Sequence, residues 1–132
     1  MTNSKTNVTS RVRVIQKLYG NSLNPDAKIE YSKSQYKKFI KDVVQGTIER
    51  NDLIEETISK YLPEDLDLKR TDKLLKIIIF AGIFELMFKH NSPTKVIISE
   101  YVKTSESFLE KAQIKFVNAI LDKISKNIRK PL

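Results

Sequence analysis

The 132-residue sequence contains no cysteine, so it offers neither a disulfide framework nor a thiolate metal site. Nothing in it therefore favours an oxidising compartment. The longest apolar segment, residues 77–88, is interrupted by Gly82 and Glu85. Its 12 residues fall far short of the roughly 20 that a membrane span requires. The N-terminal residues are polar and lack the apolar stretch of a secretory signal. We expect a cytoplasmic protein that does not enter a membrane.

The residues that most enzyme classes require are also scarce. His90 is the single histidine, it lies in a predicted turn, and no cysteine can join it in a triad or a zinc site. The three glycines are too far apart for a phosphate-binding loop. Acidic pairs such as Glu55 and Glu56 lie in polar segments, where a solvated helix surface is the simpler interpretation. We expect no enzyme activity, no cofactor and no metal, although a carboxylate enzyme is not formally excluded.

Positive charge is concentrated at the two ends of the chain. The formal net charge is +8, of which residues 1–20 carry +4 and residues 111–132 carry +5, so residues 21–110 carry −1. If the fold brings the two ends together, they form one basic surface that attracts a polyanion such as a nucleic acid. The alternative is two separately solvated basic ends.

Helical periodicity dominates the sequence, and no segment alternates apolar and polar residues long enough to predict a strand. The first helix is predicted at about 7–19, with a cap at Thr6 or Asn7 and an end at Gly20. The next helical segment begins at about residue 34 and continues to about 62, either as one helix or as two split near residue 51. Further helices are predicted at about 69–89, 93–107 and 111–128.

The apolar positions predict which faces of these helices are buried. In the first helix they are Val8, Val12, Ile15 and Tyr19, which leaves Ser10, Arg13 and Lys17 on the opposite face. The 69–89 helix is apolar on almost every face, so we expect it to be central. The buried side of the 93–107 helix should include Val96, Ile97, Tyr101 and Phe108. The last helix is predicted to bury Ile114, Val117, Ile120, Leu121, Ile124 and Ile128. Residues 1–6 and 130–132 are expected to fray.

An aromatic side chain at the edge of the last helix's buried stripe is a candidate RNA contact. Phe116 lies about 100° from the centre of that stripe and adjoins Lys115. Single-stranded RNA is held in this way, with bases stacked on aromatic rings and cations at the phosphates. A boundary phenylalanine that serves only packing is the competing interpretation.

Five sequence blocks together resemble the NusB family: RVRVIQKLYG, FIKDVVQGTIE, IIIFAGIFEL, SPTKVIISEYVKTSESF and KFVNAILDKI. They occur in the family's order and spacing between about residues 11 and 129. The resemblance implies an all-α fold: a single compact domain over residues 1–132, with about six or seven helices in two packed small bundles. It also implies a transcription antitermination factor that pairs with the ribosomal protein NusE, binds boxA RNA and acts with RNA polymerase on ribosomal RNA operons.

The resemblance carries roles over to particular residues. Arg11 matches the last arginine of the family's N-terminal basic tract, and Lys115 and Phe116 match an RNA-contacting pair, with Phe108 and Lys111 flanking the same loop. Together with Arg13 on the first helix, these are the predicted RNA-binding residues. Tyr19 matches a tyrosine that is a candidate for the protein-partner surface. No cofactor belongs to this activity.

Two other functions remain open at this point. NusB-like domains also precede the catalytic domain of some ribosomal RNA cytosine methyltransferases, so the chain could be such an RNA-binding domain standing alone. It could instead be a helical module that binds only protein, including a weak homodimer. The predicted RNA surface requires the first and last helices to lie side by side, so that Arg11, Arg13, Lys115 and Phe116 share one patch.

Overall fold

The computed structural model describes residues 9–63 and 71–129, and this part of the chain forms six α-helices and no strand. The helices are α1 (Ser10–Leu23), α2 (Lys37–Glu49), α3 (Asn51–Ser59), α4 (Lys73–Phe88), α5 (Thr94–Ser105) and α6 (Lys111–Ile128). The all-α prediction is confirmed. The terminal residues expected to fray lie outside the described residues. Within the described ranges, no helix is long and apolar enough to cross a membrane.

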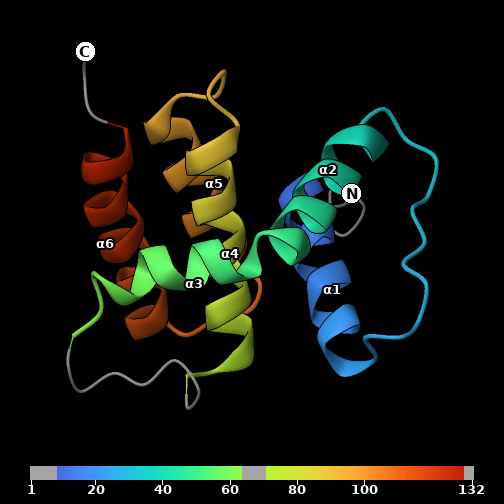
Figure 1. Cartoon of the computed structure of the whole chain (residues 1–132), viewed down its shortest axis with the longest axis horizontal. Coiled ribbons are helices and arrows are strands. Elements are labelled where there is room, and N and C mark those ends of the chain that lie inside the picture. Colours follow the sequence, from blue (N-terminus) through green and yellow to red (C-terminus); the bar gives the residue numbers. More distant parts are fainter. Residues whose placement is uncertain (1–8, 64–70, 130–132) are drawn as a thin grey trace, which may run out of the picture.

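The helices form two small groups that meet at α4 (Figure 1). One group is the pair α1 and α2, joined by a long loop over residues 24–36. The other group packs α4, α5 and α6 against one another, and α3 connects the two by contacting both α2 and α4. Because α4 also packs against α1 and α2, both groups share one continuous core. The predicted arrangement of two packed bundles is confirmed.

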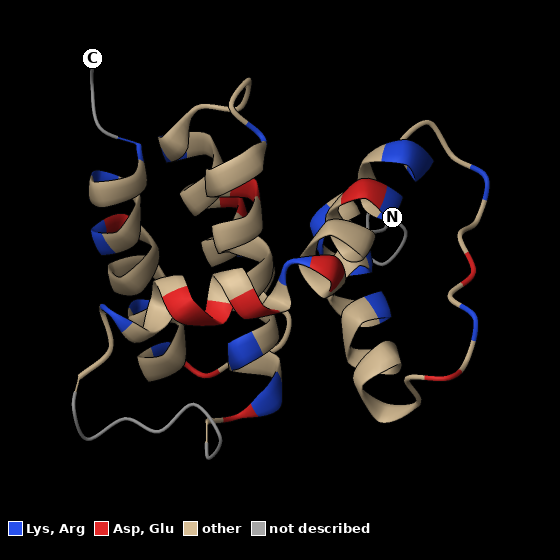
Figure 2. Ribbon diagram, viewed as in Figure 1, with Lys and Arg blue, Asp and Glu red and all other residues tan. Residues whose placement is uncertain are grey.

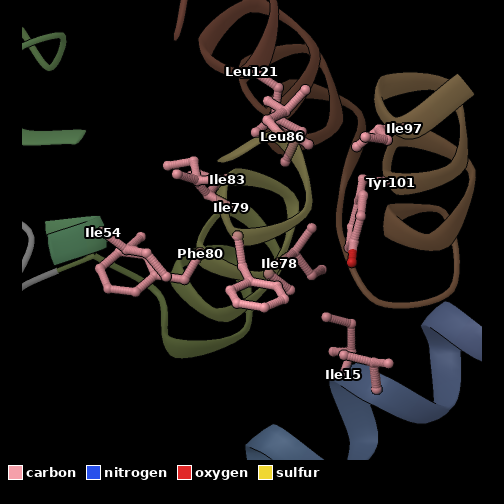
Figure 3. Close-up of a cluster of buried hydrophobic side chains, with 14 of the residues drawn as sticks. Ile15, Ile54, Ile78, Ile79, Phe80, Ile83, Leu86, Ile97, Tyr101 and Leu121 are labelled. Atoms are coloured by element: carbon pink, nitrogen blue, oxygen red, sulfur yellow. The ribbon is translucent and has the colours of Figure 1, made fainter. Parts of the chain in front are cut away.

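Helix α4 is the central element because nearly every one of its faces is apolar. Ten of its residues, from Leu75 to Leu86, are buried, as the prediction required. Figure 3 shows isoleucines of α4 surrounded by Ile15 from α1, Ile54 from α3, Tyr101 from α5 and Leu121 from α6. A helix that is covered on all sides in this way fixes the positions of the others relative to it.

Helix α1 is placed differently from the sequence prediction. The described helix starts after Thr9, whose hydroxyl accepts a hydrogen bond from the backbone N–H of Val12 at 3.2 Å; the predicted caps lie outside the described residues. The predicted end at Gly20 is wrong, because α1 continues to Leu23. One glycine costs a helix only about 1 kcal/mol. Pro25 is the stronger stop, since it restricts the residue before it to non-helical backbone.

The buried faces of two helices also differ from prediction. In α1, Val14, Ile15 and Leu18 are buried, whereas Val12 and Tyr19 are only half-buried. In α5, the predicted burial of Val96 is wrong because its side chain is 48% exposed. Ile98 is buried instead. In both helices, the buried stripe is rotated about the helix axis from the predicted one, so a residue at one edge becomes more exposed and a residue at the other edge becomes buried.

The two open questions about helix arrangement are settled by the backbone. The segment after residue 34 forms two helices, separated at Arg50. The expectation that the first and last helices lie side by side is wrong. Helix α1 packs against α2, α4 and α5, whereas α6 packs against α4 and α5, and Figure 1 shows α1 and α6 on opposite sides of that pair. Because nearly every face of α4 is apolar, α1 and α6 each cover a different part of its surface and are kept apart by it.

Two helical glycines should respond oppositely to substitution by alanine. A Cβ at Gly46 would lie 2.1 Å from the Phe84 ring, so Gly46→Ala should lower the free energy of unfolding by about 1–3 kcal/mol. A Cβ at Gly20 would meet nothing within 4 Å, so Gly20→Ala should raise it by about 0.5–1 kcal/mol. Urea unfolding followed by circular dichroism measures both. Equal effects of the two substitutions would contradict the close approach of α2 to α4.

Candidate nucleic-acid interface

A buried carboxylate joins three helices and engages Arg11, one of the predicted RNA-binding residues. Glu85 lies in α4 and is completely buried. Arg11 of α1 donates two hydrogen bonds to it, from Nε to Oε2 at 2.9 Å and from Nη2 to Oε1 at 2.7 Å. The Tyr101 hydroxyl of α5 donates to Oε2 as well. We call this set the Arg11–Glu85–Tyr101 network.

The charges of this network stabilise one another. Burial by itself would lower the pKa of Arg11, but its hydrogen bonds to Glu85 and the carboxylate charge outweigh burial, and the pKa lies above its usual value. Burial, followed by the charge of Glu85, raises the pKa of Tyr101 well above its usual value. Tyr101 therefore stays protonated as a donor, and Arg11 stays positively charged, at any physiological pH.

Arg11 is held by more than Glu85. Its guanidinium lies 3.6 Å from a carboxylate oxygen of Glu100 and sits over the rings of Phe39 and Tyr101, at 5.1 and 5.6 Å from their centroids. Only 14% of the side chain is exposed. The sequence predicted Arg11 as an RNA contact, but in the structure its hydrogen-bonding edge faces the protein interior.

The partners of Arg11 were not predicted from the sequence, although it contains a signal for them. Glu85 interrupts the most apolar segment of the chain, and an ionised carboxylate surrounded by apolar residues requires a cation and hydrogen-bond donors. Periodicity alone does not say which cation supplies the charge. The packing of α1 against both α4 and α5 is what brings Arg11 to this position.

Four of the predicted RNA-binding residues gather where α5 passes into α6. Helix α6 starts with a capping box, in which Glu110 and Gln113 satisfy each other's backbone N–H groups. Lys111 and Lys115 follow at a spacing of four, so they share one face, and both are exposed. Phe108 and Phe116 are half-buried and pack against the edge of the core. We call Phe108, Lys111, Lys115 and Phe116 the α6 cluster.

The remaining predicted residues lie elsewhere. Arg13 is exposed and lies about 200° around α1 from Arg11, so it faces away from the partners of Arg11. It lines a small concavity beside the loop over residues 24–36 rather than joining the α6 cluster. Tyr19 is half-buried near the other end of α1. In Figure 2, basic residues lie on α1, at the start of α2 and along α6, whereas α3 is mainly acidic.

Among the described residues, no group of three or more histidine, cysteine or acidic side chains is arranged to hold a metal ion. The local chemistry consists of exposed cations, half-buried aromatic rings and one buried ion pair. Such an arrangement can bind an anion and stack against flat groups.

Known proteins of one family are similar to the chain. A family model described as the NusB family matches residues 5–126. Transcription antitermination protein NusB of Mesorhizobium japonicum is 36% identical over 92 residues, which are 70% of this chain and 59% of that protein. The match therefore spans less than two thirds of that relative. The corresponding protein of Novosphingobium aromaticivorans is 36% identical over 101 residues, which are 76% of this chain and 68% of that protein.

A solved structure, that of T. maritima NusB, superposes with a TM-score of 0.77 at 25% sequence identity. The superposition covers 96% of this chain and 93% of that one. The whole six-helix arrangement is thus shared, and not only one of its two bundles.

The Arg11–Glu85–Tyr101 network should be essential for stability. Arg11→Met leaves the buried carboxylate of Glu85 without its cation, so the free energy of unfolding should fall by about 3–5 kcal/mol. Glu85→Gln should also destabilise, and the double variant should lose less than the sum of the two single losses because the groups act as one unit. A double-mutant cycle in urea tests this. Strict additivity would show that the pair contributes no mutual stabilisation.

Proposed function

The chain belongs to the NusB family, and on this premise we propose that it is a non-enzymatic, cytoplasmic RNA-binding adaptor of transcription antitermination. Its RNA ligand is a boxA-type single strand. Its protein partner is the ribosomal protein NusE, and the complex acts with RNA polymerase during transcription of ribosomal RNA operons. The relatives are named transcription antitermination proteins, which supports a role in antitermination. The fold shared with T. maritima NusB supports extending that role to this protein, because the likeness covers nearly the whole chain.

The observation that best supports RNA binding is the α6 cluster. Its two lysines are exposed and share one face, so they can approach consecutive phosphates of a strand. Its two phenylalanines are half-buried, and therefore combine a fixed position with a surface on which a base can stack. The cluster needs no rearrangement of the core, because the capping box and the buried stripe already fix the start of α6.

Arg11 has a positioning role in this proposal. Its guanidinium is occupied by Glu85 and Glu100, so it fixes the start of α1 against α4 and α5 instead of binding phosphate.

Tyr19 stays a candidate for the NusE surface, because its half-buried ring lies on α1, away from the network. Light scattering of the chain alone, with NusE, and with NusE and RNA separates the adaptor from a homodimer that binds no RNA.

Removing the two lysines of the α6 cluster should weaken RNA binding in a salt-dependent way. For single-stranded RNA, the slope of log K against log salt changes by about 0.7 for each phosphate that the protein no longer neutralises. Lys111→Gln combined with Lys115→Gln should therefore make the slope shallower by about 1.4. Fluorescence anisotropy with a boxA oligonucleotide at several salt concentrations gives the slope.

The matched control removes two exposed lysines elsewhere, Lys60 and Lys95, by the same substitution. This double variant has the same net charge as the test variant and should keep the wild-type slope. If both variants change the slope equally, general charge and not the α6 cluster governs binding. A wild-type protein that binds boxA no better than a scrambled oligonucleotide would refute the proposed function.

Phe116→Ala should reduce RNA affinity by about 1–3 kcal/mol, because a stacked base would lose its aromatic partner. Phe88→Ala is the control, since Phe88 is also half-buried but lies at the far end of α4 and packs against Phe84. Both variants remove packing at the edge of the core, so their stabilities should fall comparably, while only Phe116→Ala should affect binding. Unchanged affinity in a folded Phe116→Ala protein would remove this ring from the RNA surface.

A further inference from the structure

A small concavity between α1 and the start of α2 is lined by four basic side chains. They are Arg13 and Lys17 of α1, Lys33 of the connecting loop, and Lys37, the first residue of α2. None of the described residues that line it is acidic. We call this concavity the basic pocket.

The four cations converge because of the local backbone. Arg13 and Lys17 are four residues apart, so they project from one face of α1. The loop over residues 24–36 returns from the end of α1 to the start of α2 along the outer side of this helix pair (Figure 1). It brings Lys33 and Lys37 to the same place, although they are 16 and 20 positions away from Lys17 in the sequence.

The charges of the basic pocket are not compensated within the described part of the protein. Arg13, Lys33 and Lys37 form no salt bridge there, and Lys17 lies against the Tyr31 ring, 5.6 Å from its centroid. Two lysines outside the basic pocket are paired instead: Lys38 of α2 and Lys89 at the end of α4 lie 2.9 and 3.5 Å from an Asp42 oxygen. Like charges gathered without a carboxylate repel one another, so a bound anion would be stabilising.

Three further features match a small oxyanion. The start of α2 carries no acidic residue in its first turn and has no side-chain cap, so its partial positive charge adds to that of the lysines. Ser32 and Ser34 supply hydroxyl groups at the rim. The cavity measures about 100 Å³. It therefore has room for more than one water, which needs about 10–15 Å³, but is well below the roughly 300 Å³ at which drug-sized ligand sites begin.

We propose that the basic pocket binds a phosphate group through Arg13, Lys17, Lys33 and Lys37. Taken with the proposed function, on which this choice of source rests, the phosphate is a phosphodiester of the RNA backbone, contacted at a place separate from the α6 cluster. The pocket thus positions the strand without reading its sequence, because phosphate contacts carry no base information. This also gives a role to Arg13, which the structure separates from the α6 cluster.

The test uses Lys33→Gln combined with Lys37→Gln, with the Lys60→Gln/Lys95→Gln protein as the control of equal charge. All four lysines are exposed, so neither variant disturbs the core. With the boxA oligonucleotide, the pocket variant should bind more weakly and its salt slope should be shallower by about 1.4. The difference in affinity from wild type should then shrink about sevenfold between 50 and 200 mM salt. A scrambled oligonucleotide should lose affinity to the same extent.

A titration with inorganic phosphate tests the basic pocket without RNA. Added at constant ionic strength against chloride, phosphate should shift the backbone amide resonances of residues 32–37 in the wild-type and control proteins, and not in the pocket variant. If these resonances move but the pocket variant binds RNA as the control does, the pocket takes free phosphate and not the RNA backbone.

The two proposals fail in different ways. If phosphate moves no resonance in residues 32–37 and the pocket variant binds RNA as the control does, the basic pocket is overturned, while binding that depends on the α6 cluster keeps the proposed function. If the wild-type protein binds no RNA but phosphate still shifts residues 32–37, the proposed function is overturned and the phosphate site remains.

Discussion

The buried carboxylate of Glu85 is the constraint on which the rest of the structure depends. An ionised group in the middle of the most apolar helix is tolerated only with a cation and hydrogen-bond donors close by. Arg11 supplies the charge from α1, and Tyr101 supplies a hydroxyl from α5. Since these residues come from three helices, satisfying one carboxylate fixes α1 and α5 against α4 and therefore joins the two helix groups at a defined angle.

The same interaction decides what α1 presents to solvent. With Arg11 turned toward Glu85, the helix buries Val14, Ile15 and Leu18. Arg13 and Lys17 then face the loop that leads to α2. Arg11 joins α1 to α4 through Glu85, and Arg13, two positions along the chain, stays exposed on the other side of the helix, where it can bind an anion. The positive surface is thus divided between the start of α6 and the outer side of α1, rather than forming a single patch.

Much of the fold was predictable because helices of this kind are encoded locally. The bounds of α6 and the central position of α4 follow from apolar spacing, which one helix carries by itself. The end of α1 was misjudged because Gly20 only weakens a helix, whereas Pro25 terminates it. Of the candidate site, the residues of the α6 cluster were named through the family resemblance, and Phe116 also from its place at the edge of the buried stripe. The ion pair between Arg11 and Glu85 and the separation of Arg13 from Phe116 could not be predicted, since both depend on how the helices pack against one another.

The sequence by itself determined that the chain is helical, that it is basic at both ends, that it has no cysteine and a single histidine, and that its motifs are those of one family. Only the tertiary structure decided which cations are paired internally and which remain on the surface. The physical reason is that periodicity records a side chain's preference for burial within its own helix. The partner of a charge is chosen by contacts between residues far apart in the chain, as in the 74 positions that separate Arg11 from Glu85.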